Sequence, residues 1–113
     1  MATAVFRQQG AAIDYTPGSD VAAGAVVVQG ELVGVARLDI KANTLGALAV
    51  EGVFDFPKAT GGGTAIAAGA DVFWNAAAQQ ATTNAAAGAN KKLGRTVRSA
   101  ADGDALVRVR LSQ

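Results

Sequence analysis

The sequence predicts an all-β fold, a small single-domain β-barrel or sandwich of short strands with at most one short helix. Its 113 residues suit one domain spanning positions 1–113, because a chain of this length can bury one hydrophobic core but not two. Fourteen glycines occur at irregular spacing, with short β-branched runs between them. This pattern is typical of strands joined by tight turns.

The first half of the chain begins with expected strands at residues 4–10 and 11–16. A turn at residues 16–20 follows, because proline fixes φ at one central position of a turn and glycine accepts a positive φ at the next. Residues 25–40 then predict two strands that are separated at Gln29–Gly30.

Residues 46–56 alternate between apolar and polar side chains, which predicts a half-buried strand. Phe54 and Phe56 share one face of this strand, and Asp55 points to the other. Pro57 ends the strand, since it lacks the N–H that a ladder needs.

The lysine and three glycines after this strand raise the question of a phosphate-binding loop. A P-loop has the pattern G-x-x-x-x-G-K-[ST] before a helix, whereas Lys58 precedes Gly61–Gly63 and no helical pattern follows. We therefore expect a flexible connector. Lys58 should be exposed at the strand end, either as a solubilising charge or as a contact with another molecule.

The second half of the chain predicts a hairpin over residues 72–83, with its tip near Ala77. The alanine-rich residues 75–92 leave one short helix open as the alternative. At the end, the run LVRVRL (106–111) places Val107, Val109 and Leu111 on one face of a strand and Arg108 and Arg110 on the opposite face.

A weak internal repeat connects the two halves. The segments VAAGAVVV (21–28) and IAAGADVF (66–73) share an AAGA turn that leads into a strand. Each is followed by a Leu-x-Gly or Leu-Gly element and then by an alternating strand. Two copies of a turn–strand–strand unit explain this pattern, and so does coincidence in a chain rich in alanine and glycine.

The residue types present exclude most catalytic chemistry. The chain has no cysteine and no histidine, which removes disulfides, thiolate nucleophiles, imidazole bases and the commonest zinc ligands. The carboxylates are too scattered for a calcium site. We expect no enzymatic activity, metal or cofactor. Neither a signal-peptide pattern nor a membrane-length apolar run occurs, so we expect a cytoplasmic origin and no membrane attachment.

The charge is uneven, although the net charge is only +1. From Gly88 onward, six basic residues stand against two aspartates. This basic end is either a solvated face or a docking surface for an acidic or nucleic-acid partner. The arginines of this basic end and the lysine discussed above are the candidate contact residues. They are Lys58, Arg95, Arg98, Arg108 and Arg110.

Four segments carry a resemblance that covers nearly the whole chain, namely VAAGAVVVQGELVGVA (21–36), GVFDFPKA (52–59), AAGADVFWN (67–75) and KKLGRTVRSAADGDALVRVRL (91–111). Together they resemble a family of small tailed-phage and prophage head proteins, described as capsid cement or decoration proteins. Many members carry the label "predicted RecA/RadA family phage recombinase", which finds no support here because the Walker lysine is missing.

The resemblance implies a small β-rich protein that binds the outside of the assembled head and reinforces it. The implied partner is the major capsid protein, and the implied location is the virion exterior after assembly in the host cytoplasm. A nucleic-acid-binding accessory protein is the alternative. Binders of single strands interleave aromatic residues with positive charges, and residues 88–113 contain no aromatic residue.

The composition also predicts association between copies. Alanine is the main contributor to an apolar share of 50%, and aromatic residues make up 5%. Small side chains bury little area each, so a homo-oligomer would add stability. We expect a trimer, because phage shells offer three-fold sites.

Overall fold

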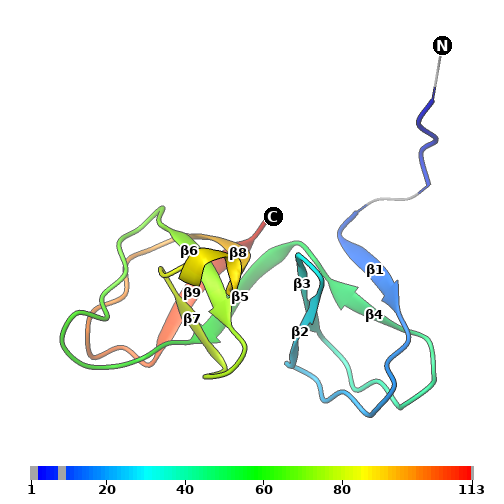
Figure 1. Cartoon of the computed structure of the whole chain (residues 1–113), viewed down its shortest axis with the longest axis horizontal. Helices are drawn as coiled ribbons and strands as arrows, with labels where there is room; N and C mark the ends of the chain where they lie inside the picture. The colour runs from blue at the N-terminus through cyan, green and yellow to red at the C-terminus, as the bar shows by residue number, and fades with distance from the viewer. Residues whose placement is uncertain (1–2, 8–9, 113) are drawn as a thin grey trace.

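The computed structural model describes residues 3–7 and 10–112, which form two antiparallel β-sheets that lie side by side (Figure 1). The first sheet has the order β1-β4-β3-β2 and the second β5-β9-β8-β6-β7. The strands are β1 (Ala12–Tyr15), β2 (Val26–Gln29), β3 (Leu32–Ala36), β4 (Gly46–Ala49), β5 (Gly52–Pro57), β6 (Asp71–Asn75), β7 (Gln80–Thr82), β8 (Lys91–Thr96) and β9 (Leu106–Leu111). A single 3-10 turn, η1 (Ala86–Gly88), is the helical segment of the described residues.

The all-β class predicted from the sequence is therefore confirmed, and the two sheets are sandwich-like. The barrel alternative is wrong, since the described strands do not close into one. The hairpin of β6 and β7 is confirmed, with Asn75 opposite Gln80. The break between β2 and β3 at Gln29–Gly30 and the end of β5 at Pro57 are also as expected.

Two local expectations for the N-terminal part are wrong. Residues 4–7 form no strand, and the rest of that expected strand includes Gln8 and Gln9, which lie outside the described residues. Val5 and Phe6 are exposed and have no layer of the protein to pack against. Gly18 lies in a bend without the positive φ that a type II turn requires.

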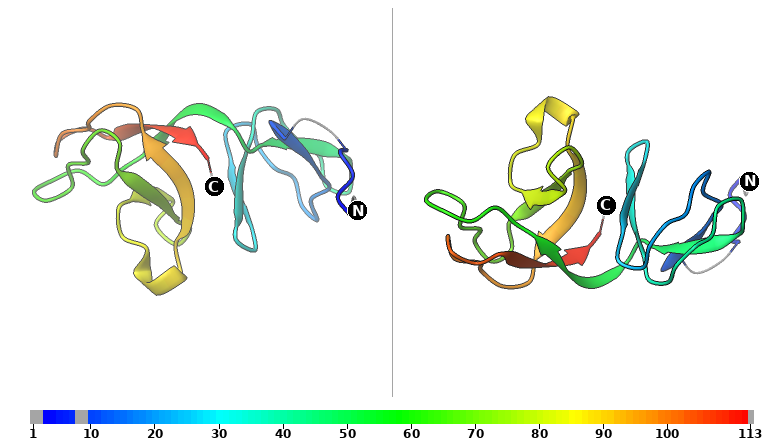
Figure 2. Two further views of the ribbon diagram at one scale, coloured as in Figure 1. Left: turned by 90° about the horizontal axis from the view of Figure 1, so that it is seen from above. Right: turned by 90° about the horizontal axis from the view of Figure 1, so that it is seen from below.

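The two sheets repeat one arrangement of four strands. The order β1-β4-β3-β2 in the first matches β5-β9-β8-β6 in the second, where β7 is an addition at the edge. We call residues 10–51 the first unit and residues 52–112 the second unit. Figure 2 shows them from two further sides, joined where the chain passes from β4 into β5.

The repeat extends to strand register and to single hydrogen bonds. Val21 forms an isolated bridge with Ile40, and Ile66 forms the matching bridge with Ala100. In the AAGA turns, the Gly24 N–H donates to the Ala36 carbonyl at 2.6 Å, and the Gly69 N–H donates to that of Thr96 at 3.0 Å. The turn–strand resemblance in the sequence thus reflects a repeated unit of four strands.

The two units differ in the size of their cores. The first unit has a small cluster of buried residues, Ala36, Ile40 and Leu48, which four half-buried side chains cover. The second unit holds the main core, which contains Phe56, Val72, Trp74, Leu93, Val107, Val109 and Leu111. Two valines of the first unit, Val33 and Val35, belong to this main core. The two units are therefore packed against each other through β3.

A glycine occupies the same position of both units, in β3 and β8, because a neighbouring strand comes very close there. A Cβ added to Gly34 would lie 2.8 Å from the Cβ of Leu48, and one added to Gly94 would lie 1.9 Å from the carbonyl oxygen of Arg110. A backbone atom cannot move aside as a side chain can. We therefore expect Gly94 to be the more strictly required residue.

We predict that Gly94→Ala lowers the free energy of unfolding by about 3 kcal/mol, the upper part of the usual range for overpacking. Gly34→Ala should cost less, and Gly62→Ala should cost little, since nothing lies within 4 Å of a Cβ there. Urea unfolding followed by tryptophan fluorescence measures all three variants. Equal stability of Gly94→Ala and Gly62→Ala would show that β8 and β9 are not held as close as described.

Candidate functional site

The outward side of β5, β9 and β8 brings most of the predicted contact residues together. The main core holds Val107, Val109 and Leu111 on the inner side of β9, so Arg108 and Arg110 point outward. Arg95 of β8 lies directly opposite Arg110, and Arg98 is exposed just beyond the end of β8. We call this surface the arginine face, which consists of Val53, Asp55, Arg95, Val97, Arg98, Leu106, Arg108 and Arg110.

Two of these arginines are held by aspartates of neighbouring strands. Arg108 donates from Nε to Asp55 Oδ1 at 2.9 Å and from Nη2 to Oδ2 at 3.3 Å, so the pair is bidentate. Arg95 Nε donates to Asp71 Oδ1 at 3.0 Å. Arg98 and Arg110 form no ion pair with the described residues. Their charges are therefore the ones available to a partner.

The electrostatic effect of this cluster is visible at Asp55. The hydrogen bonds from Arg108 hold the pKa of the Asp55 carboxyl below its ordinary value of 3.8, against the opposing effect of desolvation. The positive charges of Arg108 and Arg98 lower this pKa further. In turn, the hydrogen bond and charge of Asp55 raise the pKa of Arg108. Arg98 therefore lies close enough to act on the same carboxylate.

Apolar side chains lie among the charges of the arginine face. Val53, Val97 and Leu106 expose 55%, 47% and 54% of their surface. Val53 is opposite Arg110 in the register of β5 and β9. Arginine is enriched in protein interfaces relative to the rest of the surface, so arginines beside a group of exposed apolar side chains fit a docking surface.

A shallow depression of about 310 Å³ adjoins the arginine face, and Lys92, Arg95, Arg110 and Ser112 line it. Lys92 Nζ also lies 3.6 Å from Asp71 Oδ1, so Lys92 and Arg95 share one carboxylate, whereas Arg110 forms no ion pair with the described residues. The hollow has the size and charge to receive an acidic side chain.

Lys58 does not belong to this surface, and its expected exposure is wrong. The residue is only 4% exposed. Its ammonium donates to the carbonyls of Ala59 at 2.7 Å and Asp104 at 3.0 Å, and Thr64 Oγ1 lies 3.4 Å away. A buried charge needs such partners, because desolvation is otherwise very costly. Lys58 is thus a structural residue that ties two loops together.

The triple-glycine segment is also tied down and is not the flexible connector expected from its composition. Asp102 Oδ1 accepts the backbone N–H of Thr64 at 3.0 Å and that of Ala65 at 2.8 Å. The Gly61 N–H donates to the Asp102 carbonyl at 2.9 Å. The positive φ of Gly61 and Gly63 lets the chain follow this path. The turn at Asp102–Asp104 serves as the anchor.

Sequence reasoning did not identify the apolar part of the arginine face. The alternation in LVRVRL gives Leu106 the same orientation as Arg108 and Arg110, which is a signal that can be read without a structure. Val97 lies beyond the end of β8, so its orientation does not follow from a strand pattern. The partners of Arg95 and Arg108 depend on strand order, which the sequence did not specify.

The described residues contain no group of three or more His, Cys, Asp or Glu side chains that is able to hold a metal ion. Among the same residues, no helix has the length and hydropathy needed to span a membrane.

Comparison with known proteins gives one finding. A family model described as phage cement protein matches residues 7–111, which includes both units. No curated protein and no solved structure matches the chain.

The buried lysine gives a prediction about stability. Lys58→Met removes the donor shared by the carbonyls of Ala59 and Asp104 and leaves them unpaired. Since an unpaired buried polar group costs about 1–3 kcal/mol, we expect a loss of about 2 kcal/mol and faster hydrogen exchange at Thr64 and Ala65. Lys41→Met, at an exposed position, is the control. Unchanged stability and exchange in Lys58→Met would refute the structural role.

The Asp55–Arg108 pair gives a prediction about pH. Because the pKa of Asp55 is lowered in the folded state, its contribution to stability is fully present above about pH 4 and is lost as the pH falls through the folded pKa. Asp55→Asn should thus be slightly less stable than wild type at pH 7, and the stabilities of the two proteins should converge near pH 2.

Asp14→Asn is the matched control, since Asp14 has the equivalent position in the first unit, opposite Ala47. Thermal melts from pH 2 to 7 measure both, and a gap that stays constant with pH would contradict the pairing.

Proposed function

The chain belongs to the phage cement proteins, whose family model matches residues 7–111, and we propose that it binds the outer surface of the capsid shell and stabilises it. Its partner on the particle is the major capsid protein. It is made in the host cytoplasm, joins the virion exterior during assembly, and acts through binding energy without catalysis, cofactor or membrane.

The observation that carries this proposal is the composition of the arginine face. The unpaired charges of Arg98 and Arg110 lie beside the exposed apolar side chains of Val53 and Leu106. Planar guanidinium groups form bidentate bonds with carboxylates, and the apolar side chains lose contact with water on docking. We propose that this face meets an acidic and partly apolar surface of the shell.

The nucleic-acid alternative receives less support from the same face. Arg95 and Arg108 already bind aspartates at 3.0 Å and 2.9 Å, so two negative charges lie where phosphates would have to approach. An acidic side chain of a protein can enter between these pairs at single positions. A phosphate backbone presents repeated charges to the whole face, and its binding would depend strongly on salt.

We propose further that the chain folds as one domain and that its copies associate as a trimer. The valines of β3 belong to the core of the second unit, which argues against two separate domains. The buried cluster of the first unit consists of only three residues. Contacts between copies would add buried area that a cluster of three residues does not supply.

The shell proposal predicts that Arg98→Gln with Arg110→Gln weakens binding to heads that lack the protein about tenfold. Each exposed ion pair contributes about 0–1 kcal/mol, and two contacts are lost in every copy. The internal pairs of Arg95 and Arg108 stay intact, so the fold should not change. Co-sedimentation of purified protein with undecorated heads, at several protein concentrations, gives the binding curve.

The matched control is Arg37→Gln with Lys41→Gln, which removes the same charge from the first unit and should bind heads like wild type. Retention on duplex and single-stranded DNA at two salt concentrations tests the alternative. Equal weakening by both double variants would point to net charge and against the arginine face. Tight, salt-sensitive DNA binding without affinity for heads would overturn the proposal in favour of the nucleic-acid alternative.

A further inference from the structure

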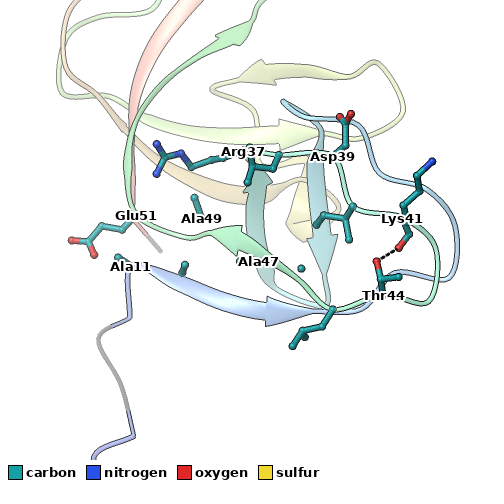
Figure 3. A pocket seen from close by; sticks show the side chains of 13 residues that line it. Ala11, Arg37, Asp39, Lys41, Thr44, Ala47, Ala49 and Glu51 are labelled. Carbon is teal, nitrogen blue, oxygen red and sulfur yellow. Dashed lines mark hydrogen bonds between the residues drawn. The ribbon is translucent and has the colours of Figure 1, made fainter.

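The first unit carries an apolar groove on the same side of the sheet that holds the arginines in the second unit. Ala47 and Ala49 of β4 lie on its floor, and the groove has a volume of about 770 Å³. Leu38 and Leu45 also line it and expose 77% and 71% of their surface. Figure 3 shows Arg37 and Glu51 at one end and Lys41 and Thr44 at the other.

The groove exists because the floor residues are small and the neighbouring segment leaves the strand. Ala49 of β4 takes the position that Arg110 takes in β9, since each lies opposite the equivalent residue of the adjacent strand, Val35 or Arg95. After Ala36, the last residue of β3, the chain moves away from the neighbouring strand β4, and Ile40 forms a bridge with Val21. The hollow is therefore built into the backbone path and does not require a side chain to move.

The N-terminal residues 3–7, which we call the arm, provide side chains of a matching kind. Figure 1 shows the arm extending away from the two units. Val5 exposes 71% of its surface and Phe6 exposes 78%. The arm carries one charge, that of Arg7. Such a pair of large apolar side chains gains free energy when it leaves water.

We propose that the arm of one copy lies in the groove of a second copy, with Phe6 on the alanine floor between Leu38 and Leu45 and with Arg7 directed to Glu51. The inference rests on the proposed association of copies and does not depend on binding to the shell. Each copy has one arm and one groove, so a head-to-tail exchange leaves neither empty when the ring closes.

Charge and reach both favour a second copy as the occupant. The groove is lined by two acidic residues, Asp39 and Glu51, and by two basic ones, Arg37 and Lys41, so the attraction of Arg7 depends on a single carboxylate, that of Glu51. Glu51 forms no ion pair with the described residues. Phe6 lies six positions before Ala12, the first residue of β1, and an extended chain spans about 3.3–3.6 Å per residue, so Phe6 can lie roughly 20 Å from that strand. That is enough to cross to an adjacent copy.

The proposal can be tested by disulfide cross-linking, because the chain has no cysteine of its own that would react. Phe6→Cys protein and Ala47→Cys protein, one carrying a mass tag, are mixed in equal amounts and oxidised gently. We expect a mixed disulfide between the two chains to form at least tenfold faster than with an Ala77→Cys control at the hairpin tip. The double variant Phe6→Cys with Ala47→Cys should give linked oligomers.

Native mass measurement at micromolar concentration provides the second readout. Val5→Ser with Phe6→Ser should weaken association between copies at least tenfold and leave the melting temperature of the monomer unchanged, since both side chains are largely exposed in the single copy. Three outcomes would overturn the inference: a disulfide within one chain, cross-linking no faster than the Ala77 control in solution and on heads, or a serine variant that associates like wild type. Since head binding by the Val5→Ser, Phe6→Ser variant is measured separately, failure of arm exchange is distinguishable from failure of the shell proposal.

Discussion

The packing of Val33 and Val35 into the core of the second unit is the interaction on which the whole molecule depends. The first unit buries few residues of its own, in a cluster of Ala36, Ile40 and Leu48. Burial contributes about 25 cal/mol for each Å² removed from water, so the first unit gains much of its stability at this boundary. The ion pair between Glu31 and Lys91 also crosses it at 2.5 Å, but Glu31 is largely exposed, and such pairs contribute little. The apolar contact therefore fixes the position of the groove relative to the arginine face.

One backbone arrangement supports two different outer surfaces. The two units agree in strand order and in the bridges that Val21 and Ile66 form directly before their AAGA turns, so the equivalent positions can be compared directly. Where the first unit has Ala47 and Ala49, the second has Arg108 and Arg110. Short side chains leave a hollow, and long charged ones build a surface that extends outward. A protein with two such faces can contact two different partners at once, which is what a stabilising shell component requires.

The sequence predicted the all-β class, the hairpin of β6 and β7 and the end of β5, because these depend on local rules. The single strand expected over residues 46–56 is wrong, since β4 and β5 are separate strands of different sheets. Pro57 ends β5 because proline has no backbone N–H to donate. Arg108 and Arg110 point outward because side chains alternate along a strand. The internal repeat was visible only as a short AAGA motif, since equivalent positions such as Ala49 and Arg110 have no chemistry in common. A backbone register can repeat without the side chains repeating.

The errors at Lys58 and at the glycine segment after it have one cause, which is that a distant segment determines the structure of both. Lys58 and the glycines after it looked exposed and flexible, but the turn at Asp102–Asp104 binds both. That turn lies about 40 residues further along the chain, and no local pattern predicts the contact. For the same reason the arginines were identified as a group, while the aspartates that pair with two of them were not.

The central claim is that the arginine face is the surface that meets the shell, and an image reconstruction of decorated heads tests it most directly. The account predicts density for this protein on the outside of the shell, with β9 and the end of β8 toward the major capsid protein and with acidic shell residues near Arg98 and Arg110. Density in which this face points to solvent, or decorated heads in which the protein lies inside with the packaged DNA, would contradict it.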